Sequence, residues 1–263
     1  MNGPIGLHGG GEYVAGDERF LDALLAAARD AARRRAAAGE PGDVVGHASK
    51  APVAEVRVVI LPTAAARGRP ERAAEMGRVA FAERAAAIGE ACVIEVAHVV
   101  DEASAQDPDH AERLRSADLI HLPGGDPDVI PTILCDSPAL AALETAWRRG
   151  AVVAGASAGA MALAEWTWTP KGGNRALGLV RGLAVVPHYD DIRRTAWQQA
   201  LDDLAPGGIG YLGLDEQTGV ISEPGAGGVR SWRVAGPGAA WWFTRGSDEP
   251  LVGQDGDLLR LPA

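Results

Sequence analysis

The stretch at residues 151–166, AVVAGASAGAMALAEW, is the strongest fold signal in the chain, because an apolar, strand-like run changes into a helical pattern at Ser157. A nucleophilic serine at such a turn needs a strained backbone, and bulky neighbours would clash where the helix returns across the strand. Five small residues avoid that clash: Gly155, Ala156, Ala158, Gly159 and Ala160. The stretch predicts a strand–turn–helix unit, in which the small residues serve either close packing or a catalytic serine.

Outward from this stretch, short apolar runs alternate with amphipathic, alanine-rich runs over the first two thirds of the chain. This alternation is typical of parallel βαβ units, so we predict an α/β fold with a mostly parallel central sheet and helices on both faces. Strands are expected within residues 56–66, 91–100, 118–125 and 151–157. Helices are expected within residues 20–35, 69–89, 107–117 and 137–150, the last with Ser137 as N-cap, Pro138 at its first position and Gly150 at its end.

The pattern changes beyond Trp166. Residues 167–178 read as a loop, residues 182–191 as a strand end, and residues 191–205 as a helix. Short β runs between glycine and proline turns then predict antiparallel hairpins added to the sheet edge, in a β-rich extension at about 219–263. Residues 37–53 read as an exposed connection, so we expect one domain over residues 1–263.

Composition excludes several classes of function. The formal charge of −10 repels polyphosphate, which predicts no nucleic-acid partner, and no apolar run is long enough to span a membrane. No secretion signal is recognised, so a cytoplasmic location is the default expectation. Cys92 and Cys135 are expected to be buried, inert thiols, and the arginines at 33–35 a solvated helix end. No ligand cluster has metal spacing, so neither a metal nor a cofactor is expected.

A nucleophilic serine needs a base, and His188 is the one histidine beyond Ser157 in the chain. It follows an apolar run and Pro187 at an expected strand end. His8, at the end of the first strand, is expected to line the same crevice as a weaker alternative. The other assignments are structural: His98 and His121 packed in or near strands, and His110 solvated on a helix.

The third residue must accept a hydrogen bond from the imidazole and hold its tautomer. Four acidic residues follow the histidine: Asp190, Asp191, Asp215 and Glu216. The first two read better as the start of the next helix. Glu216 lies at the turn after another expected strand and returns to the site from a different loop, so it is favoured, with Asp215 as the fallback.

Two backbone N–H groups are candidate oxyanion donors. One belongs to Ala158, at the start of the expected helix. The other comes from the segment HLPGGDPDVI, where Gly124 and Gly125 follow a strand and allow close approach of a substrate. The alternative for this segment is a tight turn in which Asp126 caps a helix beginning at Pro127.

These motifs together resemble peptidase family S51, the family of dipeptidase E and cyanophycinase. The matching pieces are GGD at 124–126, GASAGA at 155–160, the His188 segment and GLDEQTGVI at 213–221, in the family's order over about residues 3–223. The resemblance implies a class I glutamine amidotransferase-like fold, no cofactor, and a serine peptidase. It implies these roles: Ser157 as nucleophile, His188 as general base, Glu216 as orienting acid, and Gly125 and Ala158 as oxyanion donors.

Departures from the family's patterns limit what the resemblance implies about substrate. Cyanophycinase-like members typically carry Asp-Gln-His-Phe, whereas this chain has Val-Pro-His-Tyr at 186–189, and Pro127 replaces their glutamine. The Gly-Gly-Asn-Thr of dipeptidase E-like members is also absent. We expect hydrolysis of peptide or isopeptide bonds in small substrates next to an aspartyl residue. Candidate substrate-binding residues are Gly124, Asp126, Arg193 and Arg194, the two arginines being alternatively a solvated helix face.

Two other functions are compatible with the sequence. An esterase of small acyl groups would use the same serine and histidine, although α/β-hydrolase esterases place the acid before the histidine in the chain. A non-catalytic binding protein on this fold is the other alternative. The oligomeric state also stays open, with a homodimer among the alternatives, and the tail residues Trp232, Trp241 and Trp242 are expected in the core, at a dimer contact or on the surface.

Overall fold

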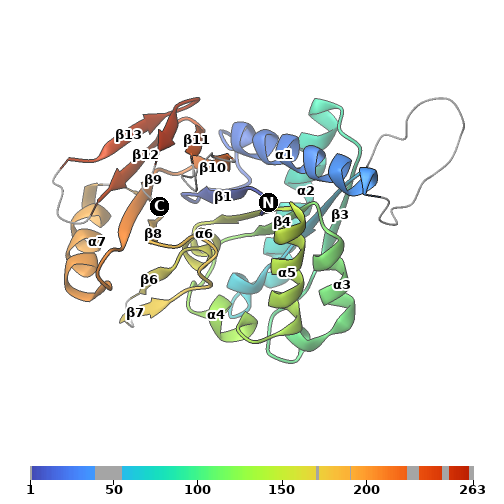
Figure 1. Ribbon diagram of the computed structural model, residues 1–263, viewed down its shortest axis with the longest axis horizontal. Coiled ribbons are helices and arrows are strands. Elements are labelled where there is room, and N and C mark those ends of the chain that lie inside the picture. Colours follow the sequence, from blue (N-terminus) through green and yellow to red (C-terminus); the bar gives the residue numbers. More distant parts are fainter. Residues whose placement is uncertain are drawn as a thin grey trace, which may run out of the picture.

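The computed structural model describes residues 2–38, 55–169, 172–189, 191–223, 231–244 and 249–260, except the side chains at 191–194 (Figure 1). The connection expected at 37–53 lies almost wholly outside these residues. Two sheets stand side by side, a larger one flanked by helices and a smaller one flanked by α7 (Asp191–Leu204). The chain passes between the sheets several times, and the one-domain organisation stays a prediction.

The larger sheet has eight strands, and its centre is parallel as expected. The strands β1, β5, β4, β2 and β3 run parallel to one another, whereas β10, β11 and β14 extend the β1 edge antiparallel. The order across the sheet is β14 (Leu258–Arg260), β11 (Ser231–Ala235), β10 (Gly219–Glu223), β1 (Ile5–His8), β5 (Val152–Ala156), β4 (Leu119–Leu122), β2 (Val56–Ile60) and β3 (Cys92–Val96). The predicted α/β fold is confirmed.

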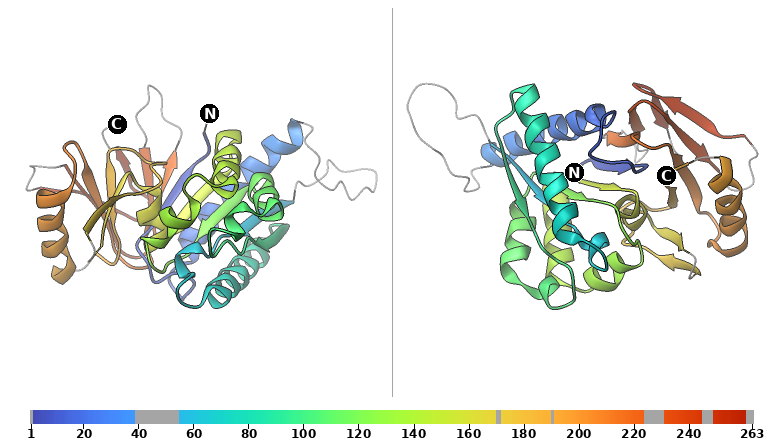
Figure 2. Two further views of the ribbon diagram at one scale, coloured as in Figure 1. Left: turned by 90° about the horizontal axis from the view of Figure 1, so that it is seen from below. Right: turned by 180° about the vertical axis from the view of Figure 1, so that it is seen from behind.

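Helices cover both faces of this sheet (Figures 1 and 2). Because strand side chains alternate, Val58 and Ile60 pack with α1 and α2, while Val59 and Ile120 pack on the opposite face. Helices α1 (Glu18–Ala37) and α2 (Pro70–Ile88) form one layer. The opposite layer includes α3 (Pro108–Ser116), α4 (Val129–Leu134), α5 (Pro138–Arg149) and α6 (Ala158–Leu163), with short 3-10 turns η1 (Thr63–Ala65) and η2 (Ser104–Gln106) in the loops.

The ends of α5 follow the sequence signals closely. The Ser137 hydroxyl accepts a hydrogen bond from the Leu140 N–H at 3.1 Å, Pro138 is the first helical residue, and Gly150 ends the helix with φ +110°. The predicted cap, first position and stop are all confirmed.

The end of α1 differs from expectation. Arg35 was expected to be solvated, but its guanidinium is buried and binds the Asp118 carboxylate through two hydrogen bonds of 3.0 and 2.9 Å. A side chain this long reaches across the end of the sheet, where a buried carboxylate needs a charged partner. The expectation is therefore wrong for Arg35.

The second sheet was not expected from the sequence. Residues 167–178 were expected to be a loop, yet most of them form the antiparallel strands β6 (Trp166–Thr169) and β7 (Gly172–Arg175). Trp168 at this hairpin packs edge-on against Trp197 of α7, with ring centroids 5.2 Å apart. The six strands lie in the order β13 (Leu251–Gln254), β12 (Ala239–Phe243), β9 (Gly210–Leu214), β8 (Leu183–Val186), β6 and β7.

The expected hairpins at the edge of the central sheet are therefore only partly correct. Strands β10, β11 and β14 do extend that sheet, but β12 and β13 join the second sheet, where β12 pairs with β9. Glycines with φ +136° at Gly236 and φ +85° at Gly256 sit where the chain changes sheet. Because such φ values favour glycine, glycine at these two positions allows the turns by which the chain passes from one sheet to the other.

The tail tryptophans belong to the core. Trp232 and Trp242 are buried, and the indole N–H of half-buried Trp241 donates to Asp215 at 3.2 Å. The cysteines differ from expectation: both are free, but Cys135 is exposed and Cys92 is only partly buried. Burial, together with the nearby carboxylates of Glu55, Glu90 and Asp118, still raises the pKa of the Cys92 thiol to about 12, so it stays protonated at neutral pH.

Candidate active site

Ser157 occupies a sharp turn between β5 and α6. Its φ of +49° and ψ of −114° lie outside the regions that non-glycine residues favour, a conformation that costs roughly 1–3 kcal/mol. The Ser157 N–H donates to the His8 carbonyl of β1 at 2.9 Å, which holds the turn against the neighbouring strand. The strained strand–turn–helix unit that the sequence predicted is therefore present.

The small residues around Ser157 are required by close backbone approach. A Cβ atom added at Gly159 would overlap the carbonyl oxygen of Leu122 in β4, and one added at Gly155 would overlap the Gly159 backbone. The start of α6 thus lies directly on β4 and β5. An alanine at either glycine would force these elements apart.

His188 reaches the serine from the second sheet, just beyond β8. Its Nε2 lies 2.9 Å from the Ser157 Oγ, and its Nδ1 lies 2.7 Å from Oε1 of Glu216, in the turn after β9. The His188 side chain is 27% exposed and that of Glu216 is 60% exposed. The structure therefore brings together the three residues that the sequence singled out as nucleophile, base and acid.

A glycine loop after β1 supports this histidine, a role that sequence reasoning missed. The His188 N–H donates to the Gly9 carbonyl at 2.7 Å, and a Cβ added at Gly10, whose φ is +104°, would overlap the His188 ring. The Gly10 carbonyl accepts from the Gln217 N–H at 2.8 Å, next to Glu216. The run of three glycines at 9–11 was the available signal.

Among the residues that the structure describes, the candidate acids Asp215 and Glu216 have different hydrogen-bond partners. Both carboxylate oxygens of Asp215 are used by β12, since they accept from the Ala239 N–H at 2.8 Å and the Trp241 indole at 3.2 Å. Asp190 and the side chain of Asp191 lie outside the described residues. Of the four candidates, Glu216 is the one whose contact with His188 is described.

The other histidines lie away from the serine hydroxyl. His8 was expected to line the crevice, but its side chain is buried and pairs with Asp17 at 2.9 Å, so that expectation is wrong. His121 is buried, its Nδ1 lies 2.7 Å from the Tyr13 hydroxyl, and burial lowers its pKa to about 3, with a smaller effect of His8. His98 is exposed rather than packed, and His110 is partly buried on α3.

The Gly-Gly-Asp turn lies beside the serine. The Gly124 N–H donates to Oε1 of Glu12 at 2.8 Å, and Gly125 has φ +152° where a side chain would overlap the Ala64 carbonyl. The Asp126 carboxylate pairs with Arg67 at 3.0 Å. The helix expected to begin at Pro127 begins at Val129, because the Asp126 side chain first closes a turn onto the Asp128 N–H.

Both candidate oxyanion donors are available. Within the residues that the structure describes, the backbone N–H groups of Gly125 and Ala158 donate to no protein acceptor. The Gly124 N–H, by contrast, is occupied by Glu12. Of the two glycines in this turn, Gly125 is therefore the one whose backbone N–H is available to a substrate.

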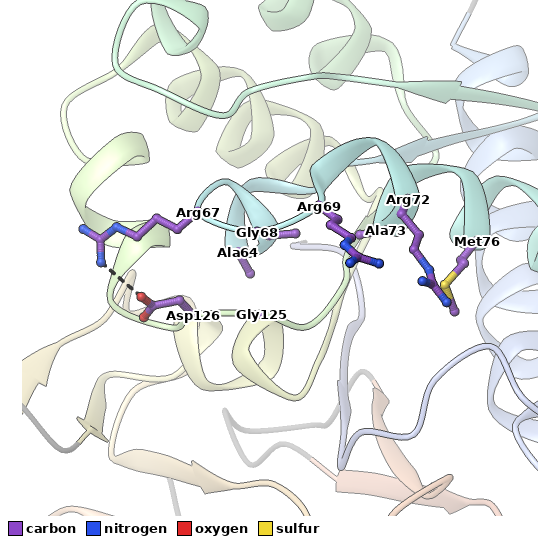
Figure 3. A pocket seen from close by; sticks show the side chains of 10 residues that line it. Ala64, Arg67, Gly68, Arg69, Arg72, Ala73, Met76, Gly125 and Asp126 are labelled. Carbon is purple, nitrogen blue, oxygen red and sulfur yellow. Dashed lines mark hydrogen bonds and ion pairs between the residues drawn. The ribbon is translucent and has the colours of Figure 1, made fainter.

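A cavity of about 420 Å³ lies beside Gly125 (Figure 3). Arg69 and Arg72, at the start of α2, line it together with Arg67 and Asp126. Arg67 is neutralised by Asp126, whereas Arg69 and Arg72 have no acidic partner among the described residues. Both arginines are exposed, so their guanidinium groups are accessible to an anion beside the cavity, and nothing in the sequence distinguishes them from the other arginines.

The remaining expectations concern two arginines, metal binding and membrane-spanning helices. Arg193 and Arg194 lie on α7, but their side chains are outside the described residues. Across the described ranges, no three His, Cys, Asp or Glu side chains are grouped in a way that would hold a metal ion. Nor does any described helix have the length and apolar character needed to cross a membrane.

Comparisons with known proteins concern the family and the fold of the chain. The model of peptidase family S51 matches residues 48–225, more than half of the chain. The crystal structure of a peptidase from an acI-B1 Actinobacterium superposes with a TM-score of 0.75 at 24% identity, covering 99% of this chain and 98% of that one. A putative peptidase E protein from Listeria monocytogenes EGD-e superposes with a TM-score of 0.51 at 14% identity, over 100% of both chains. No curated protein matches the sequence.

Proposed function

The chain belongs to peptidase family S51 and is a serine-type peptidase, and we propose that it hydrolyses aspartyl peptide or isopeptide bonds in small substrates with Ser157 as nucleophile. One observation carries this proposal. An unbroken chain of hydrogen bonds runs from the Ser157 hydroxyl through both nitrogens of His188 to Glu216, at 2.9 and 2.7 Å. This is the constellation that activates a serine hydroxyl.

In the proposed reaction, the Ser157 Oγ attacks the substrate carbonyl while the His188 Nε2 takes its proton. Glu216 accepts a hydrogen bond from Nδ1–H, which keeps Nε2 unprotonated before the attack and stabilises the imidazolium that forms. The same imidazolium then protonates the leaving amine. Water, deprotonated by His188, attacks the acyl group and releases the acid and the serine.

The proposed oxyanion donors are the N–H groups of Gly125 and Ala158. Their support is that neither N–H has a protein acceptor among the described residues, so both are free to bind a developing charge. Gly124 packs near Ser157, with the position of an added Cβ 3.3 Å from the Ser157 Cβ, so its neighbour Gly125 lies close to the nucleophile. Removing one such donor typically slows turnover by about 100- to 1,000-fold.

The preference for an acidic residue rests on the cavity beside Gly125. Arg69 and Arg72 are the described cations there without an acidic partner, and a guanidinium binds a carboxylate in two-pronged geometry (Figure 3). Asp126, proposed from the sequence as a substrate contact, is paired with Arg67 and so helps to shape the cavity wall. We therefore assign carboxylate binding first to Arg69 and Arg72, ahead of Arg193 and Arg194.

The test is hydrolysis of a panel of dipeptides that begin with α-aspartyl, β-aspartyl, asparaginyl or leucyl residues, with matched acyl esters and with products identified. We expect aspartyl dipeptides to be cleaved, with turnover lost in Ser157→Ala. Arg69→Ala and Arg72→Ala should each reduce the preference for aspartyl over asparaginyl by about 10-fold. Cleavage of esters alone would instead identify an esterase, and no reaction with any compound would indicate a binding protein.

A further inference from the structure

Glu12 places a carboxylate next to the nucleophile. It lies in the loop between β1 and α1, and its Oε1 accepts the Gly124 N–H at 2.8 Å. A Cβ added at Gly124 would lie 2.8 Å from this oxygen and 3.3 Å from the Ser157 Cβ. The carboxylate and the serine therefore border the same small space in front of Gly124.

The charge of Glu12 is not balanced by the protein residues described around it. Its described hydrogen bonds and ion pairs amount to the Gly124 N–H alone, and its second oxygen has no partner among them. The nearby acid Asp17 is already paired with His8, and Arg69 and Arg72 line the cavity beside Gly125. An unbalanced carboxylate next to a developing oxyanion disfavours the reaction unless a cation comes with the substrate.

A peptide substrate supplies such a cation in one position. The α-amino nitrogen of a residue lies two bonds from its carbonyl carbon, at about 2.5 Å. If the residue attacked by Ser157 is the amino-terminal one, its protonated amine must lie within a few ångströms of the serine. Glu12 is the described acid that borders this space without a cationic partner.

We propose that Glu12 binds the protonated amino group of the substrate residue whose carbonyl Ser157 attacks, which restricts cleavage to the bond after a free amino-terminal residue. This inference rests on the proposed function, because it requires Ser157 to be the nucleophile. Glu12 is a specificity residue in this account, and it takes no part in proton transfer.

The variant Glu12→Gln separates charge from structure. The glutamine carbonyl still accepts the Gly124 N–H, so the loop is kept while the negative charge is lost. Glu18→Gln is the matched control, since Glu18 is the first residue of α1, accepts one backbone N–H from Gly16 at 2.9 Å, and is exposed. Glu12→Asp keeps the negative charge, but its side chain is one methylene shorter, so the carboxylate lies farther from Gly124.

The measurement is the ratio of kcat/KM for aspartyl p-nitroanilide to that for its N-acetyl derivative. We expect the wild-type protein to prefer the free amine, and Glu12→Gln to reduce that ratio by at least about 10-fold. Glu18→Gln should keep the ratio within about twofold, and Glu12→Asp should fall between wild type and Glu12→Gln. An unchanged ratio in folded Glu12→Gln would overturn the inference while leaving the proposed function intact.

A second measurement needs no variant. In the wild-type protein, aspartate should inhibit competitively at a concentration at least about 10-fold lower than N-acetylaspartate does. Equal inhibition by the two compounds would also overturn the inference. Absence of hydrolysis of both anilides, with no labelling of Ser157 by a fluorophosphonate, would instead refute the proposed function and the inference together.

Discussion

The Ser157 Oγ and the His188 Nε2 lie 2.9 Å apart, yet the two residues reach that distance by different means. Ser157 is fixed by its own neighbours in sequence, because Gly155 and Gly159 let α6 close onto β4 and β5. His188 leaves the second sheet after β8 and is fixed by the glycine loop after β1, nearly 180 residues earlier in the chain. Both sides use tertiary contacts, but the serine side packs into the core through small residues next to Ser157 in sequence, whereas His188 is held by a loop far from it in the chain.

The two halves of the site should therefore respond differently to substitution. On the serine side the same contacts hold the nucleophile and the core, so a disturbance of that packing should lower the stability of the protein. On the histidine side the side chain of His188 is 27% exposed and is supported by the loop after β1 rather than by a helix or strand, so a disturbance should reduce turnover more than stability.

The largest effect on kcat is expected from substitution of Ser157 or His188, whose side chains are in contact. Ser157→Ala and His188→Ala should each lower kcat by about 10⁴-fold or more, because the hydroxyl and its base act as one unit. For the same reason the double variant should be no slower than either single variant. Steady-state kinetics on an aspartyl dipeptide, with circular dichroism to verify folding, would measure this, and multiplicative losses would show that the two residues act independently.

Gly159→Ala tests the serine side. Its new Cβ would overlap the Leu122 carbonyl, and we expect the free energy of unfolding to fall by about 3 kcal/mol. Gly207→Ala is the control, because nothing lies within 4 Å of an added Cβ there. Urea unfolding of both variants would measure the difference, and equal stability would mean that α6 shifts without cost.

Gly10→Ala tests the histidine side. Its Cβ would overlap the His188 ring, and a displacement of the base by about 1 Å slows catalysis by about 100-fold. Gly16→Ala carries a similar backbone strain in the same loop, at φ +108° against +104°, but meets the flexible Gln217 side chain instead. The kcat of Gly16→Ala should stay within about threefold of wild type. Equal losses of kcat in Gly10→Ala and Gly16→Ala would mean that loop strain, and not displacement of His188, slows the reaction.

Glu216→Gln should have a smaller effect on kcat, about 10- to 100-fold, because the Glu216 side chain is 60% exposed and water partly replaces it as a partner for His188. Asp215→Asn should keep kcat and lower the free energy of unfolding by about 1 kcal/mol, since Asp215 binds β12. A reversal of these two outcomes would make Asp215 the functional acid.

The smallest effect concerns a histidine outside the site. Burial lowers the pKa of His121 to about 3, so below its unfolded-state pKa of about 6.5 the unfolded chain binds a proton that the folded protein does not. Stability contributed by neutral His121 is therefore lost as pH falls below 6.5, by about 1 kcal/mol between pH 7 and 5.5. Urea unfolding should show this loss, and His121→Gln should reduce it.

Most of the central sheet could be predicted from the sequence, and so could three residues that the structure brings into contact, Ser157, His188 and Glu216. Helix α5 could be predicted because its cap, first proline and terminal glycine are local signals. Ser157 and Glu216 stood out because each lies beside a strand-like run in a distinctive pattern. Signals of this kind lie within a short stretch of sequence, so they can be recognised without knowledge of tertiary contacts.

Features that depend on distant contacts were missed. Strand β7 begins with the two glycines of a Pro-Lys-Gly-Gly segment that reads as a loop, and the pairing of β6 with β7 is supported by contacts outside the hairpin, such as that of Trp168 with Trp197. Arg35 looked solvated because Asp118 is 83 residues away. The contact of Gly10 with His188 and the position of Glu12 beside Ser157 have the same origin, since glycine runs and lone carboxylates carry no long-range signal.

Labelling with a fluorophosphonate, followed by peptide mass spectrometry, tests whether Ser157 is a nucleophile activated by His188. We expect one label per chain on the peptide that contains Ser157, none in Ser157→Ala, and a labelling rate at least about 100-fold lower in His188→Ala. An unlabelled wild-type protein, or equal labelling rates in wild type and His188→Ala, would contradict this expectation.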